Sequence, residues 1–401
     1  MSPDRLSLEA RHAQPQSPCF GGLLHYGNAQ RTRRKIGLSS KTNIDEASAA
    51  EIRLNTERRV QVIQWTWSVS SQHDKSRFMR LRYIRAKVHA VSLNFRDLII
   101  SKNQYPLDLK QSELIPVSDG AGEVVSVGSK VTKWKKGDRV AGIFTQEHQH
   151  GSTPSKDEAK TALGGSRDGM LAQYVALPHT GIVRIPSHLS FEEAATLPCA
   201  ALTAYNALYG IPTEQLRAGD TVVAQGTGGV SVFALQLAVA AGAKVVITSS
   251  SDDKLKKALS LVPESQRHLV TTVNYKTNPD WDKVALDVTQ GKGVDHVVEV
   301  GGPGTLEKSF NSIKRGGVIS TIGLVAQGEA PNVAYHALLT GAYFKGVLVG
   351  SREQFEHMNQ IFEDHKIKPL VDKVFPFEQA EEAYAYQWSQ AHVGKVVIKV
   401  Q

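Results

Sequence analysis

The hydrophobic positions in the middle of the chain follow three patterns in succession. Residues 221–224 form a short apolar run rich in β-branched side chains, which is typical of a strand buried on both faces of a parallel sheet. Residues 232–241 have the composition of a buried helix, and Gly242 can end it as the residue after the C-cap. Residues 244–248 form a second apolar run. These segments predict a strand, turn, helix and strand of about 30 residues, the length of one βαβ unit.

The turn between the first strand and the helix is rich in glycine. Without a Cβ, its backbone can approach a pyrophosphate, and the helix that follows points unpaired N–H groups and its positive dipole end at the phosphate. Ser231 stands where the Gly-x-Gly-x-x-Gly pattern has its third glycine, and an ordinary glycine turn remains the alternative. Because both flanks match the required strand and helix, we expect a dinucleotide site. The residues predicted to line it are Gly226, Thr227, Gly228, Gly229 and Val230.

The end of the second strand predicts which dinucleotide binds. NAD sites usually place a carboxylate there for the ribose 2′-hydroxyl, whereas this chain has Ser249, Ser250 and then Lys254. Small hydroxyls and a cation suit the 2′-phosphate of NADP(H). In the alternative interpretation, Ser250 or Ser251 caps the next helix and Lys254 is a solvated surface charge. Either aspartate of the following pair could also turn toward the ribose.

Composition places limits on the class of protein. The 401 residues are 41% hydrophobic, enough for two or three domains of about 150 residues each. Residues 1–85 hold 15 of the 47 basic and 7 of the 39 acidic residues, so the remainder carries 32 of each. The net charge of +8 therefore lies in the N-terminal segment, and we expect no nucleic-acid partner. No apolar run reaches the roughly 18 residues of a membrane span, so we expect no membrane partner either.

The two cysteines and the basic N-terminal segment bear on the compartment. Cys19 and Cys199 form no disulfide framework, which favours a reducing, cytoplasmic location. The N-terminal segment lacks the apolar core of a secretory signal. A transit peptide, an interaction tail and an unstructured leader all remain open, and its acidic residues and length disfavour a mitochondrial presequence.

Upstream of the glycine turn the pattern is different. Residues 87–98 read as an apolar strand, a polar turn and a helix, and residues 115–128 and 134–141 alternate short strands with Gly and Asp turns. This pattern predicts a small β-barrel rather than further βαβ units.

Several segments together resemble the medium-chain dehydrogenase/reductase superfamily, which includes zinc alcohol dehydrogenases, quinone oxidoreductases and enoyl reductases. The resemblance runs from Lys87 to Gln401. It implies an α/β fold with two domains. A GroES-like β-barrel is made from the two ends of the chain, and a Rossmann domain with a doubly wound parallel sheet is inserted between them in the sequence. The segments that carry it are Asn94-Phe-Arg-Asp97, Gly120-Ala-Gly-Glu-Val-Val, Lys136-Gly-Asp-Arg-Val140, residues 195–205, the glycine turn and residues 392–398.

The resemblance also implies domain limits. We expect a basic extension at 1–57, the first part of the catalytic barrel at 58–205, the NADP-binding Rossmann domain at 206–350 and the returning part of the barrel at 351–401. Residues 58–67 could supply the first barrel strand, but residues 75–85 are basic and lack the family's Pro and Gly, and residues 1–55 match nothing. The chain therefore differs from the family before Lys87. A true extension, an aberrant N-terminus and a damaged barrel edge would all explain this difference.

Zinc is not expected, although the resemblance raises it. In zinc-dependent members a Cys takes the place of Asn94, a His-Glu pair takes the place of Ser118-Asp119, and a third ligand lies near Cys199. Asn and Ser are poor zinc ligands, and a catalytic site needs three protein ligands. Residues 145–167, where a structural zinc lobe would lie, contain no Cys. His148 and His150 read as members of a polar surface loop rather than as metal ligands.

The resemblance implies roles for further residues. Asn94 should lie beside the nicotinamide and donate to a substrate oxygen or hold the ring. Arg96 would contact an anion or carbonyl, and Asp97 would orient its neighbours or act as a helix N-cap. Tyr105 and Tyr205 could line the pocket or belong to the core. The remaining cofactor residues, for which simple turn chemistry is the alternative, are Tyr275, Gly301, Gly323, Ser351 and Lys395.

These observations favour a cytoplasmic, zinc-independent NADPH oxidoreductase that transfers hydride to a small carbonyl, enone or quinone, in a homodimer or monomer. Two alternatives stay open. An alcohol or aldehyde dehydrogenase would use the same cleft reversibly, and a cofactor-binding protein without turnover would bind NADPH and reduce nothing.

Overall fold

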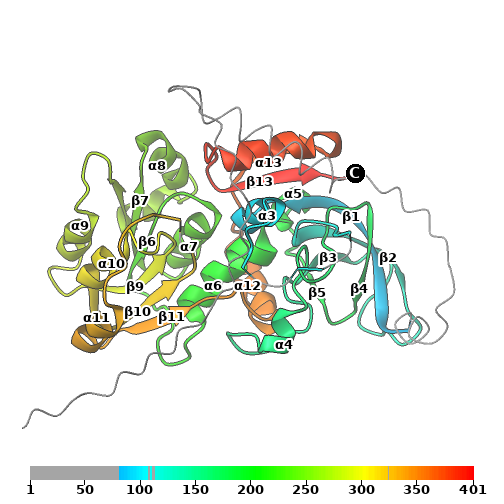
Figure 1. Cartoon of the computed structure of the whole chain (residues 1–401), viewed down its shortest axis with the longest axis horizontal. Helices are drawn as coiled ribbons and strands as arrows, with labels where there is room; N and C mark the ends of the chain where they lie inside the picture. Colours follow the sequence, from blue (N-terminus) through cyan, green and yellow to red (C-terminus); the bar gives the residue numbers. More distant parts are fainter. Residues whose placement is uncertain (1–80, 107–108, 111–112, 324) are drawn as a thin grey trace, which may run out of the picture. The chain divides into compact units, whose positions relative to one another are not determined.

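The computed structural model describes residues 81–106, 109–110, 113–323 and 325–401, which build two β-sheets and the helices around them (Figure 1). The first sheet has the strand order β12-β13-β1-β2-β3-β5, with β4 also paired to β1, and the second has the order β11-β10-β9-β6-β7-β8. The strands of the first sheet are β1 (Tyr83–Ser92), β2 (Asp119–Val127), β3 (Arg139–Gly142), β4 (Tyr174–Pro178), β5 (Ile182–Arg184), β12 (Val371–Pro376) and β13 (Lys395–Lys399). Those of the second are β6 (Thr221–Ala224), β7 (Lys244–Ser249), β8 (Val270–Asn274), β9 (Val294–Glu299), β10 (Ile313–Thr321) and β11 (Tyr343–Gly346).

Helices connect the strands and cover the sheets. The π-helical turn Leu197–Ala201 leads directly into α6, and the 3₁₀ turns Glu264–Leu269 and Phe377–Gln379 lie in connections. The α-helices are α3 (Phe95–Ser101), α4 (Lys156–Ala159), α5 (Phe191–Ala194), α6 (Leu202–Tyr209), α7 (Gly229–Ala240), α8 (Asp252–Leu259), α9 (Trp281–Val288), α10 (Leu306–Ser312), α11 (Val333–Thr340), α12 (Arg352–Asp364) and α13 (Ala380–Trp388).

The second sheet is the doubly wound unit predicted from the hydrophobic pattern. All its described strand pairs are parallel. Successive residues of β6 face opposite sides, because side chains alternate along a strand: Val222 and Ala224 pack into the core with α6 and α7, and Val223 packs into the core with α9 and α10. The βαβ unit is confirmed as β6, α7 and β7, and Gly242 follows the helix with a φ of +77°. The helix begins earlier than predicted, because Gly228 serves as its extended N-cap.

The first sheet is assembled from two distant parts of the chain. Strand β13 lies between β12 and β1, and its residues pair antiparallel with β1, Val91 opposite Ile398. All strands of the parallel sheet fall between these two parts in the sequence, so the Rossmann sheet is inserted into a GroES-like barrel.

The first described barrel strand begins four residues before Lys87, where the resemblance starts. Strand β1 starts at Tyr83, with Ile84 and Ala86 buried, so residues 83–86 belong to the sheet despite their basic composition. Arg85 is on the exposed face, where its guanidinium lies 4.3 Å from the centre of the Tyr174 ring. The strand expected at 58–67 and the extension at 1–57 lie outside the described residues.

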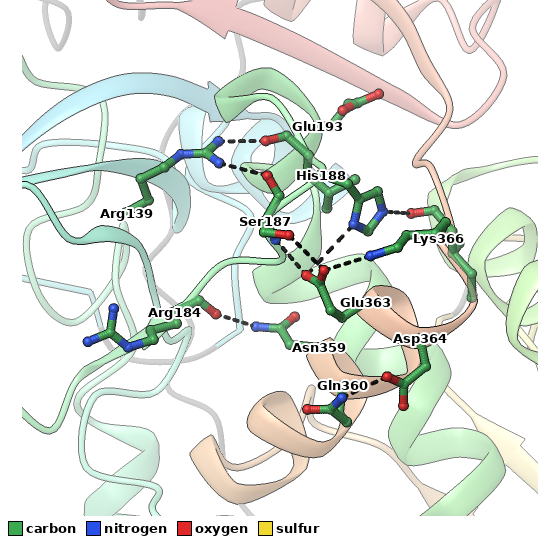
Figure 2. A network of polar contacts seen from close by, with 12 residues as sticks. Arg139, Arg184, Ser187, His188, Glu193, Asn359, Gln360, Glu363, Asp364 and Lys366 are labelled. Carbon is green, nitrogen blue, oxygen red and sulfur yellow. Dashed lines mark hydrogen bonds and ion pairs between the residues drawn. The ribbon is translucent and has the colours of Figure 1, made fainter.

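Helix α12 is fastened to the barrel at both ends. At its start, Arg352 N donates to His148 O at 2.9 Å. At its end, Figure 2 shows Glu363 accepting hydrogen bonds from the backbone N and Oγ of Ser187, at 2.6 and 2.7 Å, and from Lys366 Nζ at 2.8 Å. These donors, Lys366 above all, lower the pKa of Glu363 to about 2. The polypeptide after the parallel sheet thus returns to the barrel at α12.

In the part of the chain that the structure describes, no helix combines the length and the hydrophobicity needed to cross a membrane.

Candidate active site

The glycine-rich turn connects the carboxyl end of β6 to α7. Gly226 has a φ of +77° and its N–H donates to Thr248 Oγ1 at 3.2 Å, while the hydroxyls of Thr227 and Ser249 lie 3.4 Å apart. A Cβ added at Gly226 or Gly228 would meet no atom within 4 Å. The backbone at these two positions is therefore open to close approach by a ligand, as a pyrophosphate requires.

The third glycine of the turn serves a different purpose. A Cβ at Gly229 would lie 2.6 Å from Lys395 Cδ, so the missing side chain makes room for the stem of this lysine. The segment before it is bonded to the same turn, since Gly394 N donates to Thr227 O at 3.0 Å. The Rossmann turn and the barrel strand β13 therefore meet at Lys395.

Lys395 extends from this junction into the barrel. Only 3% of the residue is exposed, and its Nζ donates to Leu93 O at 2.6 Å and to Asn94 Oδ1 at 2.5 Å. Asn94 is the N-cap of α3 and is itself 9% exposed. Its amide Nδ2 is buried and lies beside the Asp119 carboxyl, whose pKa the Asn94 side chain helps to lower. The amide is thus fixed on its oxygen side and has a donor left over.

Asp97 holds the same turn from the other side. Its Oδ2 accepts a hydrogen bond from Asn94 N at 2.8 Å, and its Oδ1 is buried without a partner in the described part of the chain. Burial raises the pKa of Asp97 to about 6, against the opposing effect of Arg96. The N-cap of α3 is Asn94, so Asp97 is not the N-cap; it contacts the N-cap residue from the first turn and orients it.

The positions that hold zinc in zinc-dependent members form a connected group here. Asp119 is fully buried; its Oδ1 accepts from Ser118 Oγ at 2.7 Å and its Oδ2 from Cys199 N at 3.2 Å. Burial raises the pKa of the Asp119 carboxyl, against Lys395, and burial also raises the pKa of the Cys199 thiol.

These residues do not fit a zinc ion. The oxygen of the Asn94 amide already faces the Lys395 ammonium group, which would repel a metal cation. Cys199 is held as a thiol, whereas zinc binds the thiolate. Across the described residues, no group of three His, Cys, Asp or Glu side chains is arranged to hold a metal. His148 is 1% exposed rather than part of a surface loop, and burial lowers its pKa; His150 is exposed, with Nδ1 3.4 Å from Glu353.

A second buried carboxylate, which the sequence analysis missed, joins two loops at the edge of the parallel sheet. Glu299 ends β9 and is 0% exposed. Its oxygens accept from five donors: Gln225 Nε2 at 2.6 Å, Thr305 Oγ1 at 2.6 Å, Gly301 N and Gly302 N at 2.8 Å, and Ser309 Oγ. Gln225 Oε1 in turn accepts from Val300 N and Gly301 N at 3.2 Å. The loops after β6 and β9 are thereby fixed together. The signal in the sequence was a carboxylate inside an apolar strand.

Other predicted cofactor residues lie around the same edge. Lys254 is half-buried, and its Nζ donates to Gln390 O at 2.6 Å. Ser251 caps α8, and Ser250 is half-buried. Tyr275 is 43% exposed, with its N–H 2.9 Å from Ser249 O. Val230 packs against the core from the first turn of α7, and a Cβ at Gly323 would lie 2.8 Å from Val300 O.

Three further candidates point elsewhere. The hydrogen bonds of Arg96 go to Leu163 O at 2.9 Å and Tyr105 Oη at 3.2 Å, not to Asn94. Ser351 caps α12, with its Oγ 3.3 Å from Gln354 N. Tyr205 stacks on Tyr209 within α6, with ring centres 4.8 Å apart.

A Rossmann sheet inserted into a GroES-like barrel, with a glycine turn and a buried polar group at their junction, defines an oxidoreductase of the medium-chain dehydrogenase/reductase type. Residues 82–187 match the family model described as alcohol dehydrogenase GroES-like domain, and residues 229–364 match the one described as zinc-binding dehydrogenase. The chain belongs to the medium-chain dehydrogenase/reductase superfamily.

Individual relatives agree with this assignment. The chain is 48% identical over 321 residues to a zinc-type alcohol dehydrogenase-like protein of Schizosaccharomyces pombe, covering 79% of this chain and 90% of that one. It is 30% identical over 321 residues to a 2-methylene-furan-3-one reductase of Solanum lycopersicum, covering 78% and 70%. A solved structure of a putative alcohol dehydrogenase from Sinorhizobium meliloti has a TM-score of 0.72 at 36% identity, covering 80% and 91%.

Proposed function

We propose that this protein is a zinc-independent, NADPH-dependent reductase of a small carbonyl, enone or quinone. The observation that carries the proposal is the Asn94 amide, whose oxygen is held by Lys395 and whose buried Nδ2 has two hydrogens, only one of which the neighbouring Asp119 carboxyl needs to accept. A buried donor of this kind is suited to an oxygen that gains negative charge as hydride adds to the substrate.

The residues at the edge of the parallel sheet fit a dinucleotide. When bound, NADPH supplies the hydride. The open backbone at Gly226 and Gly228 and the N–H groups at the start of α7 would hold its pyrophosphate. Glu299 and Gln225 hold the two flanking loops together, and the stem of the barrel residue Lys395 passes the turn at Gly229 before its Nζ reaches Asn94.

The preference for NADPH over NADH rests on the end of β7. Ser249 is the last residue of the strand, Ser250 follows it, and Lys254 lies in the first turn of α8. In the presence of a 2′-phosphate, the Lys254 ammonium could exchange its hydrogen bond to a neutral carbonyl for one to an anionic oxygen, which is the stronger contact.

Zinc independence rests on the donor set. With Asn94, Ser118 and the protonated Cys199 at the ligand positions, polarisation of the substrate oxygen falls to hydrogen-bond donors.

The first experiment is a fluorescence titration of the purified chain with NADPH and NADH, on wild type and K254A, followed by NADPH consumption with enones, quinones and aldehydes. We expect K254A to lose about tenfold or more in NADPH affinity and little in NADH affinity, because a charge-assisted contact contributes about 1.5–3 kcal/mol. Equal affinities for the two cofactors in wild type would overturn the NADPH assignment.

Turnover and metal content separate the remaining alternatives. Oxidation of simple alcohols with NADP⁺, at rates above enone reduction, would favour the dehydrogenase alternative. Tight NADPH binding without any turnover would favour the cofactor-binding protein. Activity that is lost with a chelator and restored by zinc would refute zinc independence.

We also propose that the chain acts in the cytoplasm as a homodimer. None of the eight residues of α11 is buried, and Leu338 is 80% exposed. Residues 330–344 contain no Asp, Glu, Lys or Arg, and β11 pairs, among the described strands, with β10 alone. An apolar face beside an open sheet edge suits a second copy of the same surface, which a two-fold axis would bring into self-complementary contact.

A further inference from the structure

Lys395 occupies a position where a lysine is costly. An ammonium group that is 97% removed from solvent must replace its water contacts, and the two direct acceptors recorded for it, Leu93 O and Asn94 Oδ1, are both neutral. Asp119 and Asp97 attract it at longer range, since each carboxyl is influenced by its charge. The chain therefore retains a buried cation among the residues that hold zinc in metal-dependent relatives.

The stem of Lys395 is guided to this place by the cofactor turn. It passes Gly229, where even a methyl group would collide with Cδ, and it follows the bond between Gly394 N and Thr227 O. The stem of Lys395 thus packs against the Rossmann turn, whereas its ammonium group binds residues of the barrel.

The ammonium decides which way the Asn94 amide faces. An ammonium group has three donors and no acceptor, so only Oδ1 of the amide can face it. If the amide turned over, its NH₂ group would meet the ammonium, and two donors would face each other in a buried site. Asp97 meanwhile fixes the backbone of the same residue through Asn94 N. Nδ2 is left on the side away from Lys395 with two hydrogens: the Asp119 carboxyl lies near enough to accept one, and the other remains for a substrate oxygen.

We infer that Lys395 is a positioning residue that fixes the Asn94 amide with its Nδ2 donor toward the substrate oxygen and supplies, through that amide, the positive charge that a metal supplies in zinc-dependent relatives. This inference rests on the proposed reductase function. It assigns Lys395 a task beyond cofactor binding: the donor at Asn94 is both oriented and polarised by a cation located 301 residues further along the chain.

The test uses variants of the full chain. K395M keeps the apolar stem and removes the charge, N94A removes the donor, and N94A/K395M combines them. K399M is the matched control, because Lys399 lies on the same strand but is exposed. Thermal melts establish that each variant is folded, and NADPH titrations establish that it binds the cofactor.

Turnover supplies the first readout. Removal of one oxyanion donor lowers kcat by about a hundredfold to a thousandfold, so we expect N94A and K395M each to fall in this range. Because both changes disable the same donor, the double variant should fall little further than either single variant. K399M should match wild type. Losses that multiply in the double variant, or a K395M enzyme with wild-type kcat, would overturn the inference.

A readout without turnover keeps the inference separate from the proposed function. In the NMR spectrum of protein labelled with ¹⁵N-asparagine, the side-chain NH₂ signal of Asn94 is the one that N94A removes. We expect K395M to shift or broaden this signal and K399M to leave it unchanged. An Asn94 signal that is identical in K395M and wild type refutes the positioning role, even if the enzyme reduces no tested substrate.

Should K395M fail to fold, G229A displaces the same stem by a different route, because the new Cβ occupies the path of Lys395 Cδ. We expect G229A to change the Asn94 signal as K395M would. If a folded G229A leaves that signal in place, the inference is wrong.

Discussion

Replacement of Glu299 by glutamine is the most informative single change outside the Asn94 turn. All five partners of this carboxylate are donors, so both of its oxygens serve as acceptors. Glutamine has nearly the same shape but must present an NH₂ group to one side of the cluster. The least harmful side is that of Oε2, because the Ser309 hydroxyl can rotate to accept a hydrogen bond there.

The magnitude follows from the partners left behind. With the NH₂ group in place of Oε2, Gln225 Nε2 faces another donor and loses one of its two acceptors, keeping its 2.9 Å bond to Ser309 Oγ; the lost bond costs about 1–3 kcal/mol for a buried group. The three bonds to the other oxygen survive but lose their charge assistance, and the easier burial of a neutral side chain offsets part of that loss. We expect a net destabilisation of about 3 kcal/mol, or roughly 6–12 °C in Tm for a domain of this size.

The assay is calorimetric melting of E299Q with E307Q as the matched control, since Glu307 is exposed on the next helix. E307Q should melt with wild type. E299Q should melt well below it and bind NADPH more weakly, because Gln225 also holds the loop after β9. If E299Q melts together with E307Q, the carboxylate does not join the two loops as argued here.

Three further predictions concern pH and assembly. Burial lowers the pKa of His296 to about 4, so its imidazole stays neutral in the folded state while the unfolded state takes up a proton. The protein should therefore lose up to about 3 kcal/mol of stability as pH falls from 6.5 toward 4, and urea unfolding of H296Q should show a smaller loss over that range. Burial raises the pKa of Asp97 to about 6, so its contribution has the opposite sign: stability falls by up to about 3 kcal/mol as pH rises from 3.8 to 6, and D97N should remove that slope. L338E places a charge on the exposed face of α11, and light scattering should find a monomer where wild type is a dimer, whereas a monomeric wild type would refute the proposed interface.

The parts of the fold carried by local pattern could be predicted from the sequence. The β6–α7–β7 unit follows from two β-branched runs and a glycine turn, because each side chain there is buried against its sequence neighbours. The early start of β1 was missed, because basic residues on the exposed face of a strand look in sequence like a polar linker. Ile84 and Ala86, alternating with Arg85, were the overlooked signal.

The candidate site was predicted less completely, because its contacts are set by the tertiary fold. Asn94 and Arg96 are only two residues apart, but side chains at that spacing do not face each other at the start of a helix, and Arg96 turns to Leu163 and Tyr105. The bond between Asn94 and Lys395 depends on strand pairing across 301 residues, which no local pattern encodes. Glu299 was detectable, since a charge in a buried strand requires several donors nearby.

The position of β13 inside the barrel sheet has a consequence for biosynthesis. A ribosome completes every strand of the parallel sheet before it reaches residues 395–399, so the Rossmann sheet can fold while the barrel still lacks the strand that lies between β12 and β1. Until then residues 90–92 of β1 lack their β13 partners and Asn94 has no ammonium group beside it. The nascent chain is therefore able to form its nucleotide fold before it has a reactive centre, and the two become one site only when Lys395 arrives.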